Sequence, residues 1–238
     1  MSTNPVPHPT PPDLKSRMAA TYDALAQTYA KHFVQPADPR RLKHLNTVLT
    51  LLQEAVKDSK EEPAKVLELG CGAGIPVTKA LLEHAAPKLH VTANDLSPVQ
   101  ISLARANLGT YEAEGRLVLH EGDMHALTCE PSSFSAIVAF HSLIHLPRTE
   151  QTSLLAPIAA WLKPGGLFLA NFATDEIESV VDPTWLGEEK GWVYWSSWGE
   201  EGSVRMVEEA GLEVLAREVS ADEGDARFVW VLARKKGE

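Results

Sequence analysis

Glycines alternate with other residues in the segment KVLELGCGAGIP, residues 65–76, so that Gly70, Gly72 and Gly74 directly follow an apolar run. Glycine permits positive φ angles and lets a ligand approach the backbone closely. A glycine-rich loop between a parallel strand and the next helix is a typical binding position for nucleotide-like ligands. The spacing is GxGxG rather than the GxGxxG of dinucleotide-binding folds, which weakens a pyrophosphate interpretation. A tight turn without a ligand is the alternative.

Acidic residues follow the next two apolar runs. Asp95, in VTANDLSP, stands about twenty residues after the last glycine, where a carboxylate can accept both ribose hydroxyls. Asp123, in HEGDMHAL, offers an acceptor for an exocyclic amine, with Met124 as an apolar wall. The alternatives are a helix start at Ser97 and a surface turn beside Asp123. Together with the glycines, the two acids predict a site for adenosine with a charged group near the glycine loop.

Two histidines stand four residues apart in FHSLIHLP, directly after the fourth apolar run. His141 and His145 can titrate near neutral pH, so each is a candidate base or substrate contact. The i,i+4 spacing also admits a metal site, although no glutamate stands between the two histidines as in HExxH. A structural histidine that is satisfied by backbone hydrogen bonds is the third interpretation.

Four of the six tryptophans lie in the stretch WLGEEKGWVYWSSWGEEG, residues 185–202. Aromatic side chains can form the wall of a pocket for a flat or apolar molecule, or a cage for an amine. A small separate core that anchors this stretch is the alternative. The candidate wall consists of Trp192, Tyr194, Trp195 and Trp198.

The elements that position these residues follow from hydrophobic periodicity. Apolar residues recur at helical spacing in residues 15–33 and again in residues 42–56, so two helices precede the first strand. From residue 65 onward short β-type runs alternate with helical runs, which predicts an α/β fold with a parallel sheet covered on both faces. The last two runs come consecutively and predict an antiparallel hairpin.

Composition limits the classes of function. The formal net charge of -10 argues against nucleic acid as a partner, and two cysteines are too few for a disulfide framework. No apolar run is long enough to span a membrane, so we expect a cytoplasmic protein with small-molecule partners and no membrane association. The oligomeric state stays open. The proline-rich residues 1–15 are expected to form a disordered tail before a single domain, residues 16–238, with N-terminal helices in 16–58 and an aromatic-rich insertion in 175–202.

Five motifs, VLELGCGAG, NDLSPVQISLARANL, EGDM, FSAIVAFHSLIHLP and WLKPGGLFLANF, together resemble the class I S-adenosylmethionine-dependent methyltransferases of the small-molecule type. The resemblance covers roughly residues 18–235. It implies a Rossmann-like, seven-stranded, mostly parallel sheet with an antiparallel last strand, helices on both faces and an N-terminal helical lid. It also implies S-adenosyl-L-methionine as cofactor and methyl transfer to O, N or S of a small acceptor, with S-adenosyl-L-homocysteine as product.

The resemblance also assigns residues to the cofactor. Gly70, Gly72 and Gly74 would approach the methionyl part and Glu68 would organise its ammonium, while Asp95 would hold the ribose and Asp123 the adenine amino group. The implied cofactor contacts are Tyr22, Tyr29, Glu68, Gly70, Cys71, Gly72, Gly74, Asp95, Leu96, Asp123, Met124 and Phe140. The alternatives are a non-catalytic S-adenosylmethionine-binding protein or a repurposed fold, and a protein or RNA methyltransferase. Because FHSL replaces an NPPY-like sequence after the fourth strand, the pattern favours a small acceptor.

Overall fold

A computed structural model describes residues 9–33, 38–55, 63–221 and 226–237. Most of the proline-rich tail and Val56, the last residue of the second helical stripe, therefore lie outside the described residues. No helix within these described ranges is long and apolar enough to cross a bilayer. Within the same ranges, no three His, Cys, Asp or Glu side chains are grouped to hold a metal ion.

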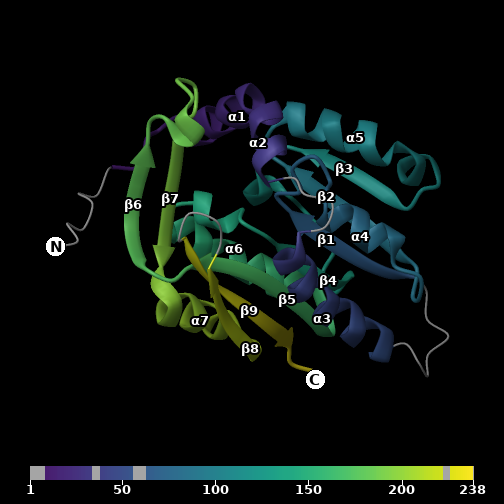
Figure 1. The fold of residues 1–238 in the computed structure, drawn as a ribbon. Coiled ribbons are helices and arrows are strands. Elements are labelled where there is room, and N and C mark those ends of the chain that lie inside the picture. The colour runs from purple at the N-terminus through teal and green to yellow at the C-terminus, as the bar shows by residue number, and fades with distance from the viewer. Residues whose placement is uncertain (1–8, 34–37, 56–62, 222–225, 238) are drawn as a thin grey trace.

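A seven-stranded sheet forms the centre of the molecule (Figure 1), in the order β3-β2-β1-β4-β5-β9-β8. Neighbours from β3 to β5 pair in parallel, whereas β9 is antiparallel to both β5 and β8. The expected mostly parallel sheet with an antiparallel last strand is confirmed, as is the C-terminal hairpin. The strands are β1 (Ala64–Leu69), β2 (Leu89–Asp95), β3 (Leu117–Glu121), β4 (Phe134–Ala139), β5 (Leu162–Ala173), β8 (Leu212–Ala221) and β9 (Arg227–Lys235).

Helices cover both faces of this sheet because its strands are apolar on both sides. On β1, Val66 packs into the core under α3, α4 and α5, whereas the next residue, Leu67, packs into the core under α6 and α7. The helices are α3 (Pro39–Ala55), α4 (Val77–Glu83), α5 (Pro98–Ala113), α6 (Arg148–Trp161) and α7 (Gly199–Glu209). Short 3-10 turns are η1 (Met124–Ala126), η2 (Leu143–His145) and η3 (Trp185–Gly187).

The N-terminal region differs from the sequence-based expectation. Residues 15–33 do not form one helix, because the chain breaks at Leu25 into α1 (Leu14–Ala24) and α2 (Ala26–Phe33). The first helix also begins inside the segment assigned to the tail, since Leu14 is only 3% exposed and packs with Met18 against Tyr194. The physical reason is tertiary: Leu14 buries its side chain against a strand that lies far along the sequence.

The aromatic-rich insertion contains a second sheet that the sequence analysis did not predict. Its antiparallel strands are β6 (Glu176–Asp182) and β7 (Val193–Trp198). Figure 1 shows α1 and α2, in purple, above the carboxyl ends of the parallel strands, with β6 and β7 on one side and α5 on the other. The N-terminal helices and the insertion thus enclose the edge of the sheet at which an α/β fold binds its ligands.

Candidate functional site

A cavity of about 90 Å³ lies at the carboxyl ends of β1, β2, β3 and β4. The predicted contacts that line it come from all of these strand ends and from the two N-terminal helices. They are Tyr22, Tyr29, Gly70, Gly72, Asp95, Leu96, Asp123, Met124, Phe140, His141 and His145. The structure therefore brings together most of the residues that the sequence assigned separately. Lys15, Met18 and Gln100 also line the cavity, and sequence reasoning did not name them.

The three glycines of the loop after β1 have different physical reasons for lacking a side chain, although all have positive φ angles of 79°, 54° and 77°. A Cβ atom on Gly70 would lie 2.3 Å from Cβ of Ser142, and one on Gly74 would lie 2.6 Å from Leu108. A Cβ atom on Gly72 would meet nothing closer than 3.7 Å. Gly70 and Gly74 thus permit close packing of the chain, and Gly72 leaves open space at the cavity wall. Gly74 itself does not line the cavity.

Asp95 joins the glycine loop to the start of α5. Its Oδ2 accepts the backbone N–H of Gly72 at 2.8 Å, and its Oδ1 accepts that of Ser97 at 2.9 Å. Burial raises the pKa of Asp95, and these two backbone hydrogen bonds oppose that shift. Each carboxylate oxygen has a second lone pair, so the group can still accept hydrogen bonds from two ligand hydroxyls. The side chain of Ser97 also caps α5 by accepting a hydrogen bond from the backbone N–H of Gln100. The alternative interpretation, in which this segment starts a helix, is therefore confirmed too.

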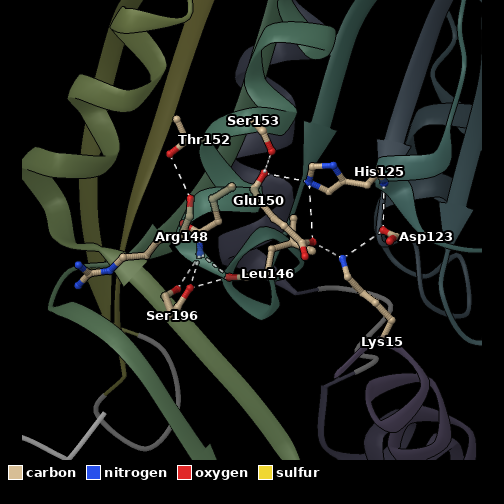
Figure 2. A network of polar contacts seen from close by, with 10 residues as sticks. Lys15, Asp123, His125, Leu146, Arg148, Glu150, Thr152, Ser153 and Ser196 are labelled. Carbon is tan, nitrogen blue, oxygen red and sulfur yellow. Dashed lines mark hydrogen bonds and ion pairs between the residues drawn. The ribbon is translucent and has the colours of Figure 1, made fainter. Parts of the chain in front are cut away.

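Asp123 lies in a polar network that ties α1 to the rest of the domain (Figure 2). Nζ of Lys15 reaches from α1 to Oδ1 of Asp123 at 3.3 Å and to Oε2 of Glu150 on α6 at 2.5 Å. The backbone N–H of His125 also donates to Oδ1 of Asp123, at 3.0 Å. These contacts hold α1 over the cavity, and among the described residues that line it Lys15 is the only lysine or arginine.

Glu68 and Cys71 do not line the cavity, although the resemblance placed both at the cofactor. Glu68 is 3% exposed behind the glycine loop and accepts a hydrogen bond of 2.6 Å from Thr78. Burial raises the pKa of Glu68 to about 8, and the Thr78 hydrogen bond lowers it only in part. Cys71 is also buried, and its backbone N–H donates to the carbonyl of Asn94. Both residues support the loop from behind.

A larger cavity of about 480 Å³ adjoins the first one. The two cavities share four lining residues, Tyr22, Tyr29, His141 and His145, which form the partition between them. The larger cavity is lined mainly by apolar and aromatic side chains, with three charged residues. These further lining residues include Arg41, Ile144, Asp175, Ile177, Val180, Trp185, Trp195, Arg227 and Phe228.

The aromatic wall of this larger cavity has a different composition from the expected one. Only Trp195 of the four candidates lines it, and Trp185 joins it. Trp192 stacks under the guanidinium of Arg17, 3.9 Å from the ring centroid, and Tyr194 is 1% exposed in the core beneath α1. Trp198 likewise packs under the guanidinium of Arg148, at 4.7 Å. These three side chains pack against other parts of the chain and do not line the cavity, in agreement with the alternative interpretation.

The two histidines of the partition make separate hydrogen-bond contacts. Nε2 of His145 lies 2.9 Å from the hydroxyl of Tyr22, and its Nδ1 lies 2.9 Å from the carbonyl oxygen of Tyr194. Nδ1 of His141 lies 3.1 Å from Nδ2 of Asn171. Burial lowers the pKa of His141 well below its usual range and the pKa of His145 to about 4. Both rings are therefore neutral at physiological pH, and the two nitrogens of His145 and Nδ1 of His141 are in hydrogen-bond contact with other residues.

The sequence and the fold were compared with those of known proteins. Residues 66–166, from β1 to β5, match the family model described as a methyltransferase domain. This segment, which carries the glycine loop, Asp95 and Asp123, is therefore a methyltransferase domain of the S-adenosylmethionine-dependent type. Malonyl-[acyl-carrier protein] O-methyltransferase of Halalkalibacterium halodurans is 28% identical to it over 166 residues. The match covers 66% of this chain and spans 59% of the length of that relative.

Solved structures share the methyltransferase fold over nearly the whole chain. Burkholderia thailandensis 1,6-didemethyltoxoflavin-N1-methyltransferase, with bound 1,6-didemethyltoxoflavin and S-adenosylhomocysteine, superimposes with a TM-score of 0.66 at 18% identity. The match covers 98% of this chain and 94% of that chain. The [4+2]-cyclase SpnF matches with a TM-score of 0.64 at 17% identity, over 98% of this chain and 99% of that one. At these identities the likeness concerns the fold alone.

The cofactor of this methyltransferase family is S-adenosylmethionine, and the residues of the smaller cavity fit its chemistry. The Cβ position of Gly72 is open, so the backbone of the loop can be approached closely. Asp95 retains lone pairs for ribose hydroxyls, and the apolar Leu96 and Met124 stand at the same cavity wall. The carboxylates of Asp95 and Asp123 can accept hydrogen bonds from hydroxyl and amino groups of such a ligand.

Proposed function

We propose that this protein transfers the methyl group of S-adenosylmethionine to an oxygen, nitrogen or sulfur atom of a small-molecule acceptor and releases S-adenosylhomocysteine. One observation carries the proposal: the cavity at the carboxyl ends of the parallel strands adjoins a second, larger cavity through a shared partition of four side chains. Transfer between two small ligands requires two binding sites whose reactive ends meet, and this arrangement supplies them.

The smaller cavity is the proposed cofactor site. In this role Asp95 would bind the ribose hydroxyls, and Asp123 the adenine amino group. Pockets for drug-sized ligands have volumes of about 300–1,000 Å³, and the cavity of about 90 Å³ is smaller. Side chains of α1, including Lys15, Met18 and Tyr22, line it, so an outward movement of α1 would enlarge it. Such a movement would break the contacts of Lys15 with Asp123 and Glu150.

The larger cavity is the proposed acceptor site. Its volume of about 480 Å³ lies within the range typical of small-molecule pockets. Trp185, Trp195 and Phe228 give it an aromatic lining that suits a flat or apolar acceptor body. When bound, the cofactor would supply an electrophilic methyl group, and the chain would orient the acceptor toward it and exclude water.

A protein that binds the cofactor without transferring its methyl group is the competing function. One observation supports this alternative: a solved structure that shares this fold over 98% of the chain is described as a [4+2]-cyclase. The fold alone does not decide between transfer and a repurposed pocket. Turnover therefore has to be measured separately from binding.

Isothermal titration calorimetry with S-adenosylmethionine and S-adenosylhomocysteine tests the cofactor site, with NAD as a negative control. We expect micromolar binding of both sulfur compounds, and a loss of about tenfold or more in affinity for Asp95→Ala, since removing a charged hydrogen-bond acceptor costs at least about 1.4 kcal/mol. Asp175→Ala is the matched control, because Asp175 lines only the larger cavity and its replacement should leave cofactor affinity unchanged.

Preferential binding of NAD, or an equal loss of cofactor affinity in both variants, would contradict the assignment. Incubation of the wild-type protein with S-adenosylmethionine and a panel of hydroxyl, amine, thiol and carboxylate acceptors then tests transfer. Formation of S-adenosylhomocysteine with at least one acceptor supports a methyltransferase. Tight cofactor binding without any turnover across the panel would favour the competing function.

A further inference from the structure

Asn171 of β5 fixes which ring nitrogen of His141 carries the proton. The backbone N–H of His141 lies 2.7 Å from Oδ1 of Asn171 and, as an N–H, can only donate. The amide oxygen must therefore face the backbone, which leaves the NH₂ group facing Nδ1 of the ring at 3.1 Å. Because the NH₂ group can only donate, Nδ1 accepts, and the neutral ring carries its proton on Nε2.

The backbone of His141 supports a positioning role for Asn171. His141 has a φ angle of 52°, in the left-handed region that non-glycine residues avoid. Such a conformation persists where the surrounding structure holds it, and it often occurs at functional sites. Asn171 is 0% exposed and binds both the backbone and the ring of this one residue. The side chain of His141 is thereby held in its place in the partition between the two cavities.

His145 is held in the opposite tautomer. Its Nδ1 faces the carbonyl oxygen of Tyr194 at 2.9 Å, and a carbonyl can only accept, so Nδ1 carries the proton. Since burial keeps the ring neutral, with a pKa of about 4, Nε2 has a lone pair and accepts the hydrogen bond from the hydroxyl of Tyr22 at 2.9 Å. Burial also raises the pKa of Tyr22 well above its usual value, so that hydroxyl keeps its proton.

We propose that the two histidines of the partition have opposite roles toward the acceptor, His141 as a hydrogen-bond donor and His145 as the proton acceptor, and that Asn171 is the positioning residue that excludes His141 as a base. This inference rests on the proposed function. It narrows the acceptor to a molecule whose attacking O–H or N–H stands beside a carbonyl oxygen or ring nitrogen. His141 would donate to that neighbouring atom through Nε2.

The proton of the attacking atom would leave through Tyr22 and His145. Tyr22 gives its hydroxyl proton to Nε2 of His145 and takes the proton that the acceptor loses. That loss accompanies formation of the bond between the attacking atom and the methyl carbon and cleavage of the methyl–sulfur bond, whose electron pair stays on sulfur. The charged groups around His141 are Arg40 and Arg41 of α3, which disfavour its protonation, as does His145 of η2. They therefore favour the neutral donor form.

Nuclear magnetic resonance of the full chain with ¹⁵N-labelled histidine tests the tautomers directly, without an acceptor. His141→Gln and His145→Gln identify the two rings among the nine histidines. From pH 5.5 to 8 we expect the Nε2–H form for His141 and the Nδ1–H form for His145, with no titration of either ring. The Nδ1–H form for His141, or rapid exchange between its two forms, would overturn the assignment.

Asn171→Asp is the decisive variant because it has the same shape but can only accept. It still accepts the backbone N–H of His141, and it demands a proton on Nδ1, so the ring should switch to the Nδ1–H form with a raised pKa. With an acceptor found by the panel, we expect kcat/KM to fall at least about tenfold, as for loss of about 1.4 kcal/mol from one hydrogen bond. S-adenosylhomocysteine affinity should stay within about twofold, while Asn46→Asp, an exposed position on α3, should change neither measurement.

The proton positions on the two histidines and the proposed function can be refuted separately. Opposite tautomers without cofactor binding would overturn the proposed function and leave the positions of the protons established. If the protein binds the cofactor and transfers the methyl group, but Asn171→Asp does not change the tautomer of His141, only the role of Asn171 is overturned. A ring switch with unchanged kcat/KM would show that His141 does not donate to the acceptor.

Discussion

Glu68 offers a test of how the buried glycine loop depends on pH. The unfolded chain ionises this glutamate above its ordinary pKa of 4.5, whereas burial raises the folded pKa to about 8. Between these values the folded state binds more protons, so the free energy of unfolding decreases as pH rises. The contribution of neutral Glu68 to the free energy of unfolding is therefore fully present below about pH 4.5, and it is lost progressively as pH rises to 8. Replacement by glutamine removes the ionisation but retains an oxygen that can accept the hydrogen bond from Thr78.

The magnitude follows from the two pKa values. One pKa unit corresponds to about 1.4 kcal/mol. Between pH 5 and pH 8 the wild-type chain should lose roughly 3 kcal/mol of unfolding free energy through Glu68, and the Glu68→Gln variant should not. The raised pKa of Asp95 also makes the free energy of unfolding decrease as pH rises. This effect is present in both proteins, so it cancels in the difference between them. The expected result is a variant that gains stability relative to wild type as pH rises.

Urea unfolding of both proteins at intervals between pH 5 and pH 8 measures this difference. Glu83→Gln is the control, because Glu83 is about half exposed at the end of α4 and has only a surface partner, Lys79. Its stability should parallel wild type at every pH. If Glu68→Gln also runs parallel to wild type, Glu68 is ionised in the folded protein and the reasoning from burial is refuted.

Two further comparisons use matched neighbours. Gly72→Ala should cost only about 1–2 kcal/mol of stability, because of its positive φ angle, and should weaken S-adenosylmethionine binding in calorimetry. Gly70→Ala should destabilise the protein by more, because its Cβ atom would lie 2.3 Å from that of Ser142. Equal losses of stability in the two variants would contradict this explanation. Trp195→Ala should raise the KM for an acceptor and leave cofactor affinity unchanged, whereas Trp192→Ala should lower the thermal midpoint and leave that KM unchanged. Loss of cofactor affinity in Trp195→Ala would argue against a separate acceptor cavity.

The central sheet could be predicted from the sequence because its signals are local. Apolar runs separated by helical periodicity give a parallel sheet, and a glycine loop and two acids at successive strand ends come together at one edge of it. Gly72, Asp95 and Asp123 therefore line one cavity, as their positions in the sequence suggested. The start of α1 at Leu14 was not predictable, because the partner that buries this side chain is Tyr194 on β7.

The parts of the site that sequence analysis missed depend on contacts between distant segments. Which tryptophans line the larger cavity depends on how the insertion packs against α1, α2 and the rest of the domain, and the amino-acid composition of the insertion does not show this. The proton positions on His141 depend on Asn171, thirty residues away on the neighbouring strand. Spacing alone could nominate His141 and His145 as a pair, but it could not give them different roles.

The partition shared by the two cavities links the two binding steps thermodynamically. Tyr22, Tyr29, His141 and His145 contribute surface to both, so a ligand in one cavity orders or displaces side chains that the other ligand also contacts. Linkage then requires the effect to be mutual: whatever factor the cofactor imposes on acceptor affinity, the acceptor imposes on cofactor affinity. With the two cavities occupied as proposed, these four side chains set how strongly one bound ligand changes the affinity for the other.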